Sequence, residues 1–204
     1  VDTEGAAGGG GGAGTSTVWI TEDAFVNSGA TTTNYGTATT LDLRNGSAGF
    51  VRQSLLEVDI GNPGSITAAT LYLYGTLTIS AGGNKTFNVY GVSPGSWTAS
   101  NVTWDTKPGT QTTSIGSFTA VQGVTGTYTV DITNYVQTVG TSTLSICIGG
   151  TPPTTPYVFY PNSSEHVNAG TTGPRVVISY DGGTDTTSPV GTITINSNGT
   201  YTTT

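Results

Sequence analysis

Positive charge is scarce in this chain. Five lysine and arginine residues stand against twelve aspartate and glutamate residues, and the net charge at pH 7 is −7. A protein that neutralises a nucleic-acid backbone, or that binds an anionic membrane surface, needs a cluster of cations. The cations of this chain are spread over its whole length: Arg44, Arg52, Lys85, Lys107 and Arg175. We therefore expect no nucleic-acid partner and no binding to anionic membranes.

Long apolar runs and paired cysteines are missing as well. No stretch approaches the roughly 20 apolar residues of a membrane-spanning helix, so we expect no membrane insertion. The chain has one cysteine, Cys147, which excludes an internal disulfide. The alternation over residues 144–148 places it on the opposite strand face from Leu144 and Ile146. Both a packed, unreactive thiol and a bridge between two chains stay open.

Threonine, serine and glycine are abundant instead, with 43, 18 and 31 residues. The β-branched threonine fits a pleated strand and glycine weakens helices. Apolar residues make up only 34% of the chain, yet they alternate with polar ones over 66–77 and 175–180, which is typical of strands that bury one face. This composition, with few lysines and a first residue other than Met, favours a mature extracellular or cell-surface protein.

About ten strands are predicted, separated by turn signals such as Asn45-Gly46 and Lys107-Pro108-Gly109. No βαβ spacing is present, so we expect an all-β, jelly-roll-type β-sandwich with extended N- and C-terminal segments. Short helical turns are expected at 100–104 and 133–139, where Asn and Thr are available as caps. The predicted strands are 17–26, 39–44, 50–58, 66–79, 85–92, 113–121, 126–132, 142–149, 156–160 and 174–180.

A series of short motifs follows in a recognisable order through the middle of the chain. They are EDAFV at 22–26, TNYG at 33–36, RQSLLEVD at 52–59, ITAATLYL at 66–73, VYGV at 89–92, SWT at 96–98, VTW at 102–104, YTVDITNYV at 128–136 and GPRVVISY at 173–180. In this order and spacing the chain resembles the DNRLRE domains, which are grouped with carbohydrate-binding module family 96. The resemblance implies a β-sandwich that binds sugar without catalysis.

One feature departs from that family. The tripeptide Ser163-Ser164-Glu165 stands where the family often has Ser-Arg-Glu, so a basic group is missing. Because binding of an acidic polysaccharide would be expected to need several cations on one face, the departure favours a neutral glycan, or none.

Aromatic rings are the usual means of holding sugars, because a ring face stacks on the apolar face of a pyranose. Trp97 and Trp104 match family positions that resemble core anchors beneath a loop. Candidates for an exposed sugar-binding surface are the aromatic residues near predicted loops: Tyr35, Phe50, Tyr157 and Tyr160.

No catalytic or zinc-binding constellation is evident. His166 is the only histidine, and no nucleophile motif accompanies it. Glu57 and Asp59 lie two residues apart on one strand face, where an ion pair with Arg52 explains them better than glycoside hydrolysis does. We expect no enzyme. Calcium stays open as the one metal that oxygen-rich loops suit, with three carboxylates as candidate ligands: Asp23, Asp59 and Asp131.

The chain divides by composition into a Gly-rich extension at 1–16, the sandwich at 17–180, and a linker with a strand-like segment at 181–204. A strand outside its own sheet can complete the open edge of another copy, and repeated contacts of this kind build a filament. The residues that would be exchanged are Val190, Thr192, Ile193 and Ile195. We expect a homopolymeric extracellular fibre subunit, with a polysaccharide-binding module as the alternative.

Glycosylation is open too. Asn-X-Ser/Thr acceptors occur at about the frequency that chance gives in so Thr-rich a chain. They are Asn45, Asn84, Asn101, Asn162 and Asn198.

Overall fold

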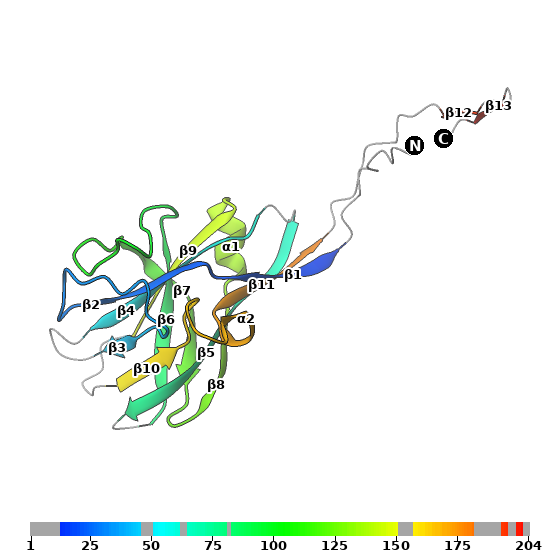
Figure 1. Ribbon diagram of the computed structural model, residues 1–204. Helices are drawn as coiled ribbons and strands as arrows, with labels where there is room; N and C mark the ends of the chain where they lie inside the picture. The colour runs from blue at the N-terminus through cyan, green and yellow to red at the C-terminus, as the bar shows by residue number, and fades with distance from the viewer. Residues whose placement is uncertain are drawn as a thin grey trace.

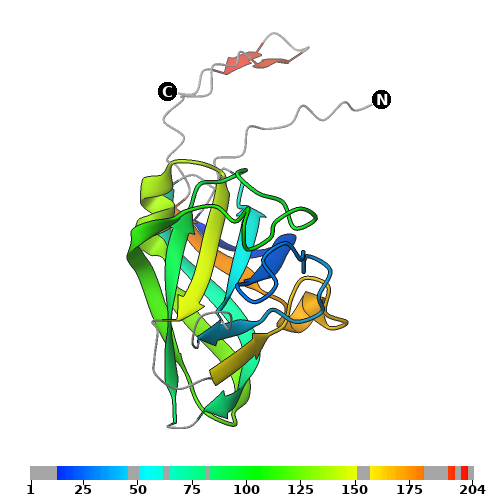
Figure 2. The same cartoon turned by 90° about the vertical axis from the view of Figure 1, so that its left-hand side faces the viewer.

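The computed structural model describes residues 13–45, 51–61, 65–80, 83–150, 157–181, 193–195 and 199–201. Phe50, Val190, Thr192, Asn198 and residues 1–12 lie outside these ranges. Eleven strands form one continuous antiparallel sheet that folds over into two layers (Figures 1 and 2). The predicted all-β sandwich is thereby confirmed.

The first layer contains the strand order β1-β11-β5, and β8 pairs with the other side of β5. Its strands are β1(Gly14–Trp19), β11(Arg175–Asp181), β5(Ser65–Ser80) and β8(Thr125–Asp131). The second half of β5 pairs with β10(Tyr157–Pro161) in place of β11, because β5 is long enough to have two partners on one side.

The second layer runs β2-β4-β9-β6-β7. Its strands are β2(Glu22–Asn27), β4(Arg52–Asp59), β9(Thr143–Gly150), β6(Lys85–Val92) and β7(Thr110–Ala120). The short β3(Leu43–Asn45) joins the two layers, since it pairs with β10 on one side and β4 on the other.

Between the layers lies a single apolar core. In β5 the odd-numbered residues from Ala69 to Leu77 are buried, while the even-numbered ones from Thr70 to Thr76 are half-buried on the outer face. This alternation follows from the two-residue period of a strand. Aromatic rings fill the centre, where Phe87 contacts both Phe118 and Phe159 at centroid distances of 5.2 and 5.4 Å.

The strand predicted at 17–26 is two strands, because the chain passes from one layer to the other at Ile20 and Thr21. The helix predicted at 133–139 is present as α1(Thr133–Val139), which ends at Gly140 in the left-handed conformation (φ 65°). Residues 100–104 form hydrogen-bonded turns rather than a helix. A second helix, α2(Ala169–Thr172), was not expected from the sequence.

The connection between β6 and β7, residues 93–109, crosses the outer face of the second layer (Figure 2). Trp97 and Val102 of this connection are buried in a second apolar cluster with Ala24, Leu55 and Cys147. Ala24 and Leu55 belong to strands of the second layer but point away from the main core. One part of the outer face of this layer is therefore covered by the chain itself.

Near the C-terminus, β12(Ile193–Ile195) pairs with β13(Gly199–Tyr201) in a separate two-stranded sheet. The strand-like character expected at Ile193 and Ile195 is present, and their partner here is a neighbouring segment of the same chain. An exchange with a second copy stays a prediction. Among the described residues, no helix has the length and apolar character needed to span a membrane.

Candidate functional site

A row of large side chains crosses the outer face of the first layer. Trp19 of β1 is the register partner of Arg175 in β11, and Arg175 is the partner of Tyr72 in β5. The Arg175 guanidinium carbon lies 5.2 Å from the Trp19 ring centroid and 4.6 Å from that of Tyr72. We call Trp19, Arg175 and Tyr72 the aromatic row. All three are half-buried, so their side chains are both held by neighbours and open to solvent.

Strand alternation explains why these residues face outward. The residues that follow them, Ile20, Leu73 and Val176, are buried in the core, so the residues of the row must point the opposite way. Tyr74 stands two residues beyond Tyr72 on the same face.

Arg175 is held by ring faces rather than by a carboxylate. In the described part of the chain no carboxylate forms an ion pair with it, and the two aromatic contacts have the geometry of cation–π interactions. The two rings therefore fix the orientation of the guanidinium.

Hydroxyl groups flank the aromatic row. Thr129 of β8 is the register partner of Tyr72, and Thr127 is the partner of Tyr74. Both threonines are exposed, as is Thr17, which precedes Trp19 on the same face of β1. The surface thus presents ring faces bordered by small donors and acceptors, which is the combination that a sugar with an apolar ring face and polar hydroxyls requires.

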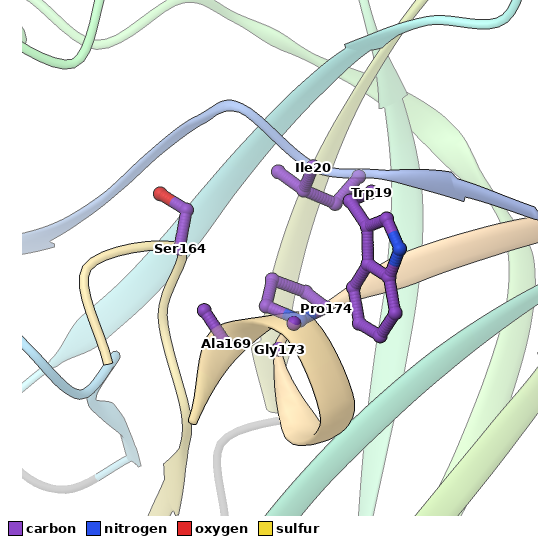
Figure 3. A pocket seen from close by; sticks show the side chains of 7 residues that line it. Trp19, Ile20, Ser164, Ala169, Gly173 and Pro174 are labelled. Carbon is purple, nitrogen blue, oxygen red and sulfur yellow. The ribbon is translucent and has the colours of Figure 1, made fainter. Parts of the chain in front are cut away.

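A shallow pocket of about 160 Å³ opens at the Trp19 end of the row. The Trp19 indole and the Pro174 ring lie side by side at the pocket, and Ala169 of α2 lies across from them (Figure 3). Gly173 is needed here, because a Cβ at this position would lie 2.5 Å from the Ala169 carbonyl oxygen. The remaining lining residues are Ile20, Ser164 and Gly170.

No titratable side chain lines this pocket, and its volume is below the several hundred Å³ typical of enzyme and drug sites. It suits the docking of one small polar ring against Trp19 better than the enclosure of a reacting substrate. The chemistry of this face is that of binding.

The three predicted sugar-binding residues that the structure describes, Tyr35, Tyr157 and Tyr160, are not brought together. Tyr160 of β10 is the register partner of Thr76, on the same outer face as Tyr74. Tyr157 is 1% exposed, and its ring meets Phe87 edge-on at 5.2 Å, so it belongs to the core and presents no face to a ligand. Tyr35 stacks on Phe25 at 4.2 Å, which covers one of its ring faces. Phe50 lies outside the described residues.

Trp97 is the core anchor that the sequence led us to expect. Its side chain is 6% exposed, and its Nε1–H donates to the Ser145 hydroxyl at 2.8 Å. Trp104 packs half-buried against the same cluster.

The carboxylates considered for catalysis have structural partners. Glu22 accepts a hydrogen bond from the Ala99 amide at 2.8 Å, and Glu57 accepts one from the Gly95 amide at 3.0 Å. Both thereby fasten the 93–109 connection to the sheet. The expected ion pair of Arg52 with Glu57 or Asp59 is wrong, since Arg52 pairs with Asp42, across the strands rather than along β4.

The three predicted calcium ligands are also dispersed. Asp59 accepts the Gly61 amide and Asp131 accepts the Thr133 amide, each in a local turn. Asp23 is 1% exposed and accepts the Ser164 amide at 2.7 Å. Within the described ranges, no group of three or more His, Cys, Asp or Glu side chains is arranged to hold a metal ion.

Asp23 is electrostatically unusual. The pKa of this carboxyl is raised from 3.8 to about 7, chiefly by burial and in part by the neighbouring Glu165, against the opposing effect of the Ser164 amide. Asp23 Oδ1 has no hydrogen-bond partner among the described residues. His166, in the same loop, accepts the Asn168 amide at Nδ1.

Cys147 is 1% exposed, and burial raises the pKa of its thiol to about 12. Such a thiol is unreactive and out of reach of a second chain, which favours the packed alternative.

Of the glycosylation acceptors, Asn84 and Asn101 are exposed, whereas the Asn162 amide donates to Thr172 Oγ1. Asn45 lies in β3, and Asn198 lies outside the described residues.

Sequence reasoning missed Trp19, Tyr72, Tyr74 and Arg175 as surface residues. The signal for the tyrosines was present, because they alternate with leucines over 71–74 and must therefore share the outer face. The juxtaposition with Arg175 depends on strand register between segments about a hundred residues apart, which no local pattern shows.

A sandwich whose sheet face presents aromatic rings beside a shallow pocket has the features of a binding surface. Comparison with known families agrees. The family model of carbohydrate-binding module family 96 matches residues 14–180, and the chain belongs to this family. No curated protein matches the chain.

Proposed function

We propose that this chain is an extracellular polysaccharide-binding module that holds a neutral glycan on the outer face of its first layer. The observation that carries the proposal is the aromatic row, Trp19, Arg175 and Tyr72, which ends at the pocket beside Pro174. Stacking of a sugar on Trp19 and Tyr72 supplies apolar contact, and the neighbouring threonines and Arg175 supply hydrogen bonds to hydroxyls.

The charge of the molecule supports a neutral glycan. Arg175 is the one cation of the aromatic row, while Arg52 is paired with Asp42 in the other part of the fold. With a net charge of −7, the module repels a polyanion at long range. A single guanidinium offers little to offset that repulsion.

The test measures binding by affinity electrophoresis and calorimetry. The ligands are three soluble neutral polysaccharides (xyloglucan, galactomannan and mixed-linkage glucan) and one acidic polysaccharide, polygalacturonate. We expect Trp19→Ala and Tyr72→Ala each to weaken binding of a neutral glycan about fivefold or more, since one stacked ring contributes roughly 1 kcal/mol. Val124→Ala, which removes an exposed apolar side chain elsewhere, serves as the control. Binding confined to polygalacturonate, or unchanged in both ring variants, would contradict the proposal.

A fibre subunit is the second candidate. The strand β1 pairs with β11 alone and so has an open edge, and the pairing of β12 involves no strand of the sandwich. Electron microscopy of the full chain and of a chain ending at Tyr180 tests it. Filaments that disappear on truncation would support strand exchange, and single particles from both forms would exclude it.

A further inference from the structure

The opposite side of the sandwich carries a second uncovered polar surface. On the outer face of the second layer, Asn88 of β6 is the register partner of Gly149 in β9 and of Ser117 in β7. Gln53 of β4 lies over Gly149, because a Cβ at residue 149 would be 3.2 Å from Gln53 Nε2. Tyr90 follows Asn88 on the same face. We call Gln53, Asn88 and Tyr90 the polar row.

The polar row begins where the covering connection ends. Leu55 and Cys147, which the 93–109 connection covers, are each 1% exposed. Tyr90 is the direct register partner of Cys147, yet it is half-buried, as are Asn88 and Gln53. The connection therefore lies on one side of the row and leaves Asn88 and Tyr90 partly exposed, whereas Gln53 Oε1 is buried.

Two further side chains belong to this connection. Trp104 packs against the cluster that contains Cys147, and Lys107 Nζ lies 5.0 Å from its ring centroid. Lys107 also acts on the Cys147 thiol, since its charge opposes the rise of that pKa. Trp104, Lys107 and Tyr90 therefore surround the same short stretch of β9.

The chemistry of the polar row suits a sugar better than a protein. The half-buried Asn88 carboxamide carries donors and an acceptor that suit adjacent hydroxyls, and its amide is oriented by its contact with Tyr90 Oη at 3.3 Å. The large apolar residues that are exposed in the described structure, Val121, Val124 and Val167, lie elsewhere, so the row lacks the apolar centre of a protein interface.

We propose that the polar row, with Trp104 and Lys107 beside it, is a second carbohydrate-binding surface. The outer faces of the two layers of a sandwich point in opposite directions, so the module holds two polysaccharide chains at once and bridges them. The second surface stands on its own residues, whereas the bridging rests on the proposed function of the aromatic row. Bridging raises the apparent affinity for a dense polysaccharide matrix without any new contact.

The experiment uses the full chain and four variants: Trp19→Ala, Tyr90→Ala, the combination of both, and Val124→Ala as the control. Thermal unfolding first establishes that each variant is folded. Calorimetry with short oligosaccharides of xyloglucan and galactomannan then counts the sites, and turbidity with the intact polysaccharides measures bridging. Gln53→Ala is a second probe of the polar row that leaves every ring in place.

We expect two sites per molecule in the wild type, one in each single variant and none in the combination. Turbidity should fall to the background in both single variants while each still binds oligosaccharide. One site that is lost in Trp19→Ala and unchanged in Tyr90→Ala and Gln53→Ala would overturn the second surface and leave the proposed function standing. One site lost only in Tyr90→Ala would overturn the proposed role of the aromatic row and the bridging. No binding by the wild type would overturn both surfaces, and a polar row that binds protein alone would overturn the second surface and the bridging.

Discussion

At the scale of single residues, Asp23 is a buried carboxylate with a second carboxylate, Glu165, beside it. Its pKa is about 7 in the folded chain, against 3.8 for an unperturbed aspartate. Below about pH 4 both states are protonated and the fold keeps its full stability. As the pH rises towards 7 the unfolded chain ionises first, so the free energy of unfolding declines, and above pH 7 the loss is complete.

We therefore expect Asp23→Asn to remove this decline. The asparagine keeps an acceptor for the Ser164 amide and carries no charge, so the variant should gain stability over the wild type at pH 8 and gain little at pH 4. The difference is on the order of a few kcal/mol. Urea unfolding at pH 4, 6 and 8 measures it. A stability difference independent of pH would show that Asp23 ionises normally in the fold.

Trp97 supplies another test at this scale, through its hydrogen bond to the buried Ser145 hydroxyl. Trp97→Phe keeps a ring in the cluster but leaves Ser145 without this donor, which costs about 1–3 kcal/mol. The double variant, Trp97→Phe with Ser145→Ala, removes both partners of the bond. It should lose less free energy of unfolding than the sum of the losses in the two single variants. Unfolding in urea measures both, and strict additivity would refute the role of this bond.

At the scale of elements, the motif TNYG at 33–36 gains a physical explanation. The Asn34 amide donates to the carbonyls of Ala99 and Val102 at 2.7 and 2.8 Å. Tyr35 stacks on Phe25, and Gly36 lies so close to residue 99 that a Cβ would be 1.9 Å from the Ala99 oxygen. The motif thus fastens the 93–109 connection to the loop after β2.

Gly36→Ala should consequently loosen the connection. The neighbour is backbone and cannot rotate away, so we expect a loss of about 1–3 kcal/mol in the free energy of unfolding, with faster amide exchange over 98–104. Gly109→Ala is the matched control, because nothing lies within 4 Å of the Cβ it would add. Equal effects of the two substitutions would contradict this account.

Elements were more predictable than the site they build. The alternation in β5 and the helix at 133–139 are present in the structure, but the expected cap is wrong, because Ile132 is the N-cap residue and no side chain caps the helix. The break between β1 and β2 was not predictable, because it depends on which layer each segment joins. The burial of Tyr157 was missed for a related reason: its position near a predicted loop gave no sign that Phe87 would lie beside it.

At the scale of the whole molecule, the sandwich is complete without the terminal segments. Every strand from β1 to β11 finds its partners within residues 14–181, and the family match covers 14–180. The apolar core draws on these strands, on α1 and on residues of the connections between them, such as Leu41 and Ile60. The stability and the sugar-binding surfaces of the molecule should therefore both reside in this unit.

We expect a chain of residues 13–181 to unfold in one cooperative transition, within a few degrees of the full chain, and to bind polysaccharide with unchanged affinity per molecule. The reason is that burial and strand pairing, which supply most of the stability, are retained in full. Calorimetric unfolding and affinity electrophoresis of the two forms side by side measure this. If the shorter chain instead unfolded many degrees earlier, the free edge of β1 would have to be covered in the full chain by a segment outside the sandwich, and strand exchange would become the better account of the termini.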